Sequence, residues 1–225
     1  MDKLTKLNQE ITRCRKCPRL VAHREAIAKN PPLRYRGQKY WARPLPGFGD
    51  PDARIYIIGL APAANGGNRT GRIFTGDRSG DWLYGTLFEV GLANQTESVA
   101  ANDGLKISST YIGASVRCAP PDNKPTLQEF QNCHPYLERE SKLLSKVRVI
   151  IALGSIAYNA TKKLVRPVPK GFRFPPFGHA RKVVLPDGRK IICSYHPSQQ
   201  NTFTGKLTRE MFLDVFREAK REAGL

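Results

Sequence analysis

The stretch Arg54-Ile55-Tyr56-Ile57-Ile58-Gly59-Leu60 decides the fold, because it is an unbroken apolar run that leads into a turn rich in glycine and alanine. Such a run predicts a strand that is buried on both faces, as strands of parallel sheets are. Shorter apolar runs predict further strands at residues 111–116, 147–153, 183–185 and 190–195. Apolar residues at helical spacing predict helices at residues 4–11, 20–28, 81–91, 127–144, 155–164 and 207–222.

Strands that alternate with helices indicate a three-layer α/β domain built around a mainly parallel sheet. In such domains ligands bind beyond the carboxyl ends of the strands. The loops that follow the first and the last long strands are therefore where we expect functional residues.

The length of the chain favours one domain that spans residues 1–225, since no linker or low-complexity segment divides it. No apolar stretch approaches the roughly 20 residues that a membrane span needs. The first ten residues are too polar for a signal peptide. We therefore expect a soluble, cytoplasmic protein.

The net charge of +18 is concentrated at the two ends of the chain. Residues 1–50 carry 12 basic and 4 acidic side chains, and residues 160–225 carry 14 and 5, whereas residues 51–159 carry 11 and 10. This distribution predicts that the ends fold together into a surface for a polyanion, with nucleic acid as the leading partner. The alternative is basic residues spread for solubility or for ion-pair networks, but such networks need acids in similar number.

Four cysteines form two pairs, Cys14 with Cys17 and Cys118 with Cys133, about a hundred residues apart. Thiols in a reducing compartment stay free unless they are catalytic or bind metal, so a shared ligand set is the favoured interpretation. Four thiolates suit either zinc or a four-iron, four-sulfur cluster. The alternative is a set of unlinked buried thiols, which is how we interpret Cys193 in its apolar run.

The loop after the first strand, residues 59–77, lacks the spacing of a dinucleotide-binding or phosphate-binding loop. Its small residues after Gly59 would let a flat ligand approach the backbone. Phe74 is a candidate for stacking on that ligand, and Asp77 for acting as a base or orienting water. The alternatives are a core aromatic for Phe74 and a helix-capping carboxylate for Asp77.

His196 follows the last strand and precedes Pro197, which favours an extended backbone that offers the imidazole to a ligand. The alternative for His196 on its own is an ordinary surface histidine.

Five motifs, taken together and in order, resemble the uracil-DNA glycosylase superfamily, and specifically its iron–sulfur family 5 branch, the type B enzymes of archaea and thermophilic bacteria. The resemblance covers essentially the whole chain. Its motifs are Cys14-x2-Cys17-Pro18-Arg19-Leu20, Gly59-Leu60-Ala61-Pro62-Ala63, Arg72-x-Phe74-Thr75-Gly76-Asp77, Arg117-Cys118-Ala119-Pro120-Pro121-x-Asn123-Lys124-Pro125 and His196-Pro197-Ser198.

The resemblance implies a three-layer α/β/α sandwich with a parallel four-stranded sheet, and an N-terminal extension that binds a structural four-iron, four-sulfur cluster. The implied function is that of a monomeric DNA repair glycosylase, which flips uracil out of double-stranded DNA and hydrolyses its bond to the sugar, leaving an abasic site. The implied cluster ligands are Cys14, Cys17, Cys118 and Cys133.

The same resemblance assigns the site residues. The catalytic residues would be Asp77, His196 and Asn123, with His196 near the carbonyl where negative charge collects. Uracil would be bound by Gly59, Leu60, Ala61, Ala63, Ala64, Asn65 and Phe74. DNA would be contacted by Ser198, Gln199, Gln200 and Asn201.

The chain departs from its superfamily in the first motif, where related branches carry an acid or amide and residues 60–64 are all apolar. Ala114 also stands where the family 4 pattern has an asparagine. Both changes enlarge the pocket, so we expect hypoxanthine to be released as well as uracil. Gln200 occupies the place of a leucine wedge in the best-known branch.

Two other classes of protein remain as alternatives. One is a DNA-binding module stapled by zinc or iron–sulfur, without catalysis; the other is an iron–sulfur redox or radical enzyme. The second lacks a cysteine-dense triplet and a nucleotide-cofactor loop.

Overall fold

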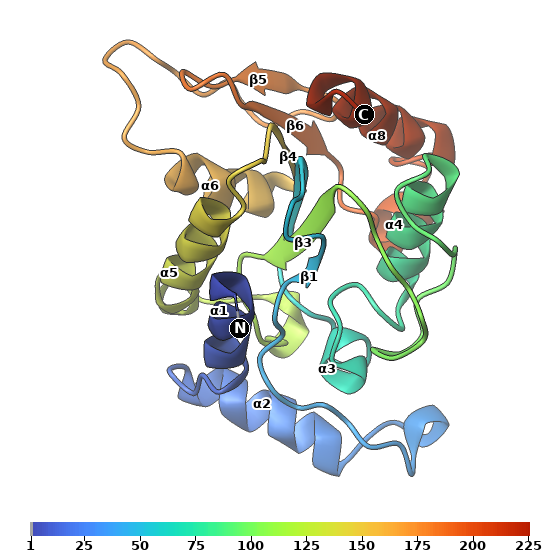
Figure 1. Cartoon of the computed structure of the whole chain (residues 1–225). Coiled ribbons are helices and arrows are strands. Elements are labelled where there is room, and N and C mark those ends of the chain that lie inside the picture. Colours follow the sequence, from blue (N-terminus) through green and yellow to red (C-terminus); the bar gives the residue numbers. More distant parts are fainter. Residues whose placement is uncertain (1) are drawn as a thin grey trace.

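In the computed structural model, which describes residues 2–225, a single six-stranded sheet forms the centre of the molecule (Figure 1). Its strands follow the order β1-β3-β2-β4-β6-β5. The four central strands run parallel, and the short edge strands β1 and β5 run antiparallel to their neighbours. The strands are β1 (Phe48–Gly49), β2 (Ile55–Gly59), β3 (Thr110–Ala114), β4 (Val149–Leu153), β5 (Lys182–Val184) and β6 (Lys190–Ser194).

The sequence therefore predicted the mainly parallel sheet correctly but the number of strands wrongly, as four instead of six. The parallel strands β3, β2, β4 and β6 account for the expected four. The two additional strands are the short edge strands β1 and β5, two and three residues long. The apolar run at residues 183–185 predicted β5, and only β1 was not predicted.

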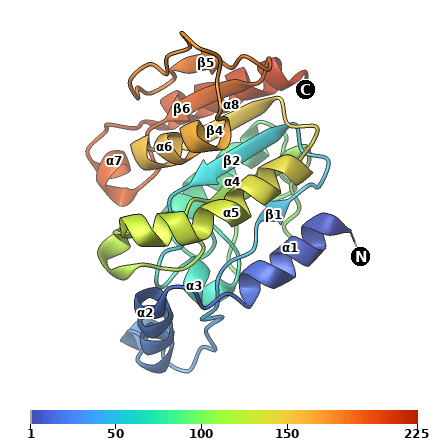
Figure 2. The same ribbon diagram turned by 90° about the vertical axis from the view of Figure 1, so that its left-hand side faces the viewer.

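Helices cover both faces of the sheet (Figures 1 and 2). Side chains alternate along β2, so that Ile55 and Ile57 pack with one helical layer and Tyr56 and Ile58 with the other. The first layer contains α4 (Arg78–Glu89) and α8 (Arg209–Ala223), and the second contains α1 (Lys3–Thr12), α5 (Leu127–Leu143) and α6 (Ser155–Leu164). This confirms the three-layer α/β/α class.

The N-terminal helices bring the first cysteine pair to the second layer. Helix α2 (Pro18–Lys29) begins with Pro18 in its first turn, where proline fits because no hydrogen bond to its nitrogen is needed. Cys17 is its N-cap residue, so both Cys14 and Cys17 lie in the tight connection between α1 and α2. Helix α5 starts with a capping box formed by Thr126 and Glu129, and carries Cys133 in its second turn.

Short elements that the sequence did not predict shape the loops at the carboxyl ends of the strands. They are η1 (Leu33–Tyr35), α3 (Gly67–Thr70), η2 (Pro121–Asn123) and α7 (Gln199–Phe203). The structure has no helix between residues 2 and 225 that is long and apolar enough to cross a membrane.

Candidate active site

A cleft of about 1030 Å³ lies where the loops after β2, β3 and β6 meet. All three residues predicted to be catalytic, Asp77, His196 and Asn123, line it. The predicted base-binding residues Leu60, Ala61, Ala63, Ala64, Asn65 and Phe74 line it too, as do the predicted DNA contacts Ser198, Gln199 and Gln200. The structure thus brings together side chains that are up to 140 residues apart in the sequence.

Phe74 is held in a left-handed backbone conformation, with φ of +52°. Its ring is buried and stacks on the imidazole of His196, with ring centroids 6.0 Å apart and an angle of 29° between the planes. Gly59, at the end of β2, lies against this ring, since a Cβ there would be 2.8 Å from Phe74 Cζ. Position 80 in α4 must be glycine, because a Cβ there would collide with the Phe74 carbonyl oxygen. Phe74 is therefore both a core aromatic and one wall of the cleft.

Asp77 is the N-cap residue of α4, and its Oδ1 accepts a hydrogen bond of 3.1 Å from the amide of Gly80. Burial raises the pKa of the carboxyl group, against the lowering effect of the hydrogen bonds from Gly80 and Ser79. Gly66 faces the other oxygen, Oδ2, and has no side chain to fill the space beside it. The carboxylate thus caps the helix with one oxygen and meets the pocket loop with the other.

His196 follows β6, and its backbone carbonyl accepts a hydrogen bond of 2.9 Å from Asn201 Nδ2. Burial lowers the pKa of its imidazole to about 4, because the charged form loses hydration among apolar neighbours. The ring is consequently neutral at neutral pH. Asn201 is not among the residues that line the cleft; its side chain holds the His196 segment, and its contact with DNA stays a prediction.

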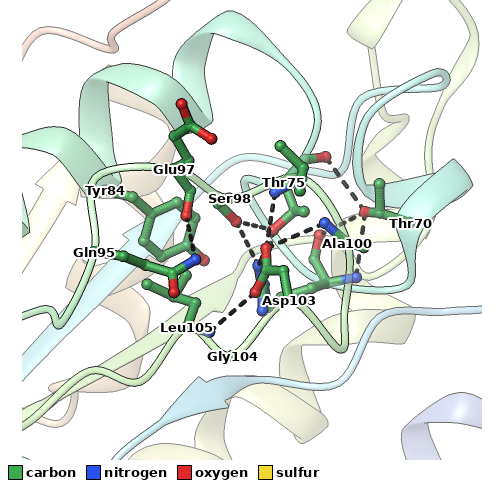
Figure 3. A network of polar contacts seen from close by, with 12 residues as sticks. Thr70, Thr75, Tyr84, Gln95, Glu97, Ser98, Ala100, Asp103, Gly104 and Leu105 are labelled. Carbon is green, nitrogen blue, oxygen red and sulfur yellow. Dashed lines mark hydrogen bonds and ion pairs between the residues drawn. The ribbon is translucent and has the colours of Figure 1, made fainter.

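A buried polar network fixes the turn that carries Phe74 and Asp77 (Figure 3). Arg72 pairs with Asp103 at 2.5 Å and also donates to Ser98 Oγ and Thr75 Oγ1. The carbonyl of Ser98 accepts from the amide of Gly76, the residue before Asp77. Because Asp103 also accepts from three backbone amides of its own loop, residues 98–105 form a rigid brace behind the turn.

The pocket loop is also held by Tyr40 and Arg69, which were not predicted as site residues. The hydroxyl of Tyr40 donates to Asn65 Oδ1 at 2.8 Å, which leaves the Asn65 amide nitrogen as the donor available to a ligand in the cleft. Arg69 donates to the Asn65 carbonyl at 2.8 Å and to the Gly76 carbonyl at 3.3 Å. Ala114, which lies beside Gly59 at the end of β3, contributes no polar group there.

Cys14, Cys17, Cys118 and Cys133, all free thiols, line a second cavity. It lies between the α1–α2 connection, the loop after β3, and α5. Cys118 and Cys133 are buried, and Cys14 and Cys17 are half-buried. Among residues 2–225, no group of three or more His, Cys, Asp or Glu side chains is arranged so that it could hold a metal ion. Cys193 is buried in β6 with its neighbours in the second layer, as predicted for a small core residue.

The chemistry around this second cavity favours an anionic group. Arg24 is buried beside it and donates from Nη1 to Cys118 Sγ at 2.9 Å, while its Nε has no partner. No carboxylate of the described residues pairs with Arg24. Asn132 Nδ2 also donates to Cys17 Sγ at 3.4 Å. Two donors aimed at sulfur, one of them a buried cation, fit thiolates better than neutral thiols.

Several residues that line the cleft were missed from the sequence. They are His23, Arg34, Tyr35, Arg78, Ser79, Asp81, Pro120 and Asp122. Arg34 and Tyr35 come from the loop between α2 and β1. The basic and aromatic composition of this loop can be seen in the sequence, but its place beside the cleft cannot.

The cleft holds an aromatic ring, a buried carboxylate and a neutral imidazole at the carboxyl ends of parallel strands. In a three-layer α/β fold, such a cleft is typical of an enzyme that encloses a small planar group. The sequence model of the uracil DNA glycosylase superfamily matches residues 46–220. The chain therefore belongs to that superfamily.

Individual relatives are similar over nearly their whole length. The type-5 uracil-DNA glycosylase of Thermus thermophilus is 52% identical over 217 residues, which cover 96% of this chain and 97% of that protein. The type-5 uracil-DNA glycosylase of Mycobacterium leprae is 48% identical over 99% of this chain and 96% of that protein. That of Pyrobaculum aerophilum is 42% identical over 95% and 91%.

Proposed function

We propose that this protein is a monofunctional DNA repair glycosylase, which releases uracil from DNA by hydrolysis and leaves an abasic site. The observation that carries the proposal is the single cleft in which Phe74, Asp77 and His196 converge. The type-5 relatives are named as uracil-DNA glycosylases, which supports the proposal. Because the bond between base and sugar is inaccessible in a stacked duplex, the nucleotide must rotate out of the helix into this cleft.

In the proposed reaction, the bond between C1′ and the base nitrogen breaks and its electron pair leaves with uracil. The oxygen of a water molecule bonds to C1′, and the proton it loses passes to solvent by way of Asp77. The burial that raises the Asp77 pKa makes the carboxylate a better proton acceptor than one in water. Oδ2, which does not serve the helix cap, is the oxygen that orients the water.

Uracil would stack against Phe74 while residues 60–65 surround its edge. Negative charge gathers on the carbonyl oxygen of the departing base, and a neutral His196 stabilises it by donating a hydrogen bond. Asn123, in η2 at the rim, supplies a further polar contact. Since Leu60, Ala61, Ala63 and Ala64 leave the loop without bulky polar groups, we propose that hypoxanthine also fits.

We further propose that the substrate is double-stranded DNA, bound by a monomer in the cytoplasm, and that residues 1–225 act as one domain. Ser198, Gln199 and Gln200 line the cleft at the start of α7. They are placed to contact the strand that holds the flipped nucleotide, with Gln200 filling the vacated stack.

The second cavity would hold a four-iron, four-sulfur cluster through Cys14, Cys17, Cys118 and Cys133. When bound, the cluster would tie the N-terminal helices to the loop after β3, as a structural group. The buried charge of Arg24 and its hydrogen bond to Cys118 support an anionic occupant. Iron and sulfide analysis of anaerobically purified protein tests this: four irons per chain are expected, and stoichiometric zinc with no iron would contradict it.

The activity itself is tested with a labelled duplex that contains uracil opposite guanine, followed by alkaline cleavage at abasic sites. Wild-type protein should convert the duplex and release free uracil. Asp77→Asn should slow single-turnover release by about 100-fold or more, the range that a positioned acid–base group contributes. Asp214→Asn, an exposed change of the same kind in α8, is the control. A duplex that wild-type protein binds but never cleaves would favour the non-catalytic DNA-binding alternative.

A further inference from the structure

The last residue of α2 and the loop that follows it form a segment, residues 29–43, that we call the basic arm. It carries five basic side chains and no acidic one: Lys29, Arg34, Arg36, Lys39 and Arg43. All five are exposed. Figures 1 and 2 show this segment projecting from the body of the molecule at the end farthest from α8.

The charges of the basic arm are uncompensated, in contrast to those of α8. None of its five basic residues forms an ion pair with any residue of the described chain. In α8, by comparison, Arg217 pairs with Glu210 and Asp214, and Arg221 pairs with Glu218. The surface around α8 is therefore locally neutralised, whereas the arm keeps positive charge that is available to a polyanion. Lys163, Arg166, Lys170 and Arg173 also lack ion pairs within residues 2–225, but unlike Arg34 they do not line the cleft.

The arm is fixed to the active site rather than attached as a loose tail. Two guanidinium groups lie over the Tyr35 ring, with Cζ of Arg34 4.6 Å and Cζ of Arg69 4.3 Å from the ring centroid. Arg69 in turn donates to the carbonyls of Asn65 in the pocket loop and Gly76 before Asp77. The backbone amides of residues 41 and 42 also donate to the carbonyls of residues 69 and 68.

The basic arm also lies beside the cleft. Arg34 and Tyr35 line the same cleft as Ser198 and Gln200, but they reach it from a different part of the chain. A duplex whose flipped nucleotide enters the cleft must therefore lie with its backbone close to both segments. Guanidinium groups that are exposed, unpaired and held on a rigid support are suited to contacting phosphates.

We propose that the basic arm is a DNA-binding surface, in which Arg34 and Arg36 contact backbone phosphates beside the flipped nucleotide. This inference rests on the proposed function. The arm would be a second DNA-contacting surface, in addition to the one formed by residues 198–200. Arg69 would then connect phosphate binding to the shape of the base pocket.

The test is the salt dependence of binding to a labelled duplex that carries 2′-fluoro-2′-deoxyuridine opposite guanine, in which the fluorine suppresses base release. Dissociation constants are measured by fluorescence anisotropy between 50 and 200 mM KCl. Each lost phosphate contact should reduce the slope of log Kd against log salt by about 0.9. The double variant Arg34→Gln, Arg36→Gln should thus reduce the slope by about 1.8 and weaken binding on the order of tenfold at 100 mM salt.

The matched control is Arg217→Gln, Arg221→Gln, which removes the same two charges from α8. It should keep the wild-type slope. An arm variant whose slope and affinity equal those of the wild type overturns the inference, and so does an equal loss in both double variants, since that would reflect net charge alone. The proposed function is tested separately by uracil release from an unmodified duplex: wild-type protein that releases no base would overturn that function, while a specific effect of the arm on binding would still stand.

Discussion

Adding one methyl group at Gly66 should disable the active site without disturbing the fold. A Cβ at this position would lie 3.0 Å from Asp77 Cγ and closer still to Oδ2, inside the separation that real Cβ atoms keep. The Asp77 carboxylate would have to retreat by on the order of 1 Å, a misplacement that can cost a catalytic group about 100-fold in rate. We therefore expect Gly66→Ala to slow single-turnover uracil release by about two orders of magnitude, with DNA affinity nearly unchanged.

The assay is rapid-quench base release with enzyme in excess over a uracil-containing duplex, in four proteins of a double-mutant cycle. If the methyl group acts through the carboxylate, Gly66→Ala should have little further effect in an Asp77→Ala background. Gly178→Ala is the matched control, because its new Cβ would meet only the flexible side chain of Arg181. Fully additive losses at positions 66 and 77, or near-native release by Gly66→Ala, would refute the reasoning.

Three further predictions concern the brace, the imidazole and the second cavity. Asp103→Asn should lower the free energy of unfolding by about 3 kcal/mol, because it leaves a buried Arg72 unpaired, as urea denaturation would show. Burial opposes ionisation of Asp103, but hydrogen bonds from Arg72 and three amides lower its pKa overall. Ionised Asp103 therefore adds to the free energy of unfolding above pH 3.8, and this addition should be lost below that pH in the wild type only. NMR titration of His196 should give a midpoint near 4, and since the unfolded imidazole titrates near 6.5, stability should fall as pH drops between these values; a midpoint above 6 would contradict the burial argument. Arg24→Gln should accelerate loss of iron to a chelator several-fold, measured as bleaching of the visible absorbance, and unchanged bleaching would show that its hydrogen bond to Cys118 does not matter.

The parts of the fold that the sequence predicted are those governed by local pattern. The apolar run at residues 55–59 and the helical spacing in residues 127–143 each place a long element within a residue or two of its observed ends. The edge strand β5 was also predicted, at residues 183–185, but the edge strand β1 was not. Phe48–Gly49 is a strand only because the loop containing it pairs with β3, a contact made across more than 60 residues of sequence.

The same distinction applies to the site. Asp77 and His196 could be selected because their motifs resemble those of a known family, since a carboxylate before a helix or a histidine before a proline is weak evidence on its own. Asp103 could not be selected in this way, since it lies in an irregular loop and its importance arises from a partner 31 residues away. Tyr40 likewise acts through Asn65, and the sequence around Tyr40 does not predict that hydrogen bond.

Asp77 shows how one carboxylate can satisfy two demands that first looked like alternatives. The cap of α4 uses Oδ1, and a cap needs only one acceptor. Oδ2 remains beside Gly66 at the edge of the cleft, where residues 60–64 provide no polar side chain. Because the helix fixes Oδ1, it also fixes the direction of Oδ2, so the structural role supplies the rigidity that the chemical role requires. An apolar first loop is then compatible with the proposed reaction, in which a carboxylate at the start of the following helix orients the water.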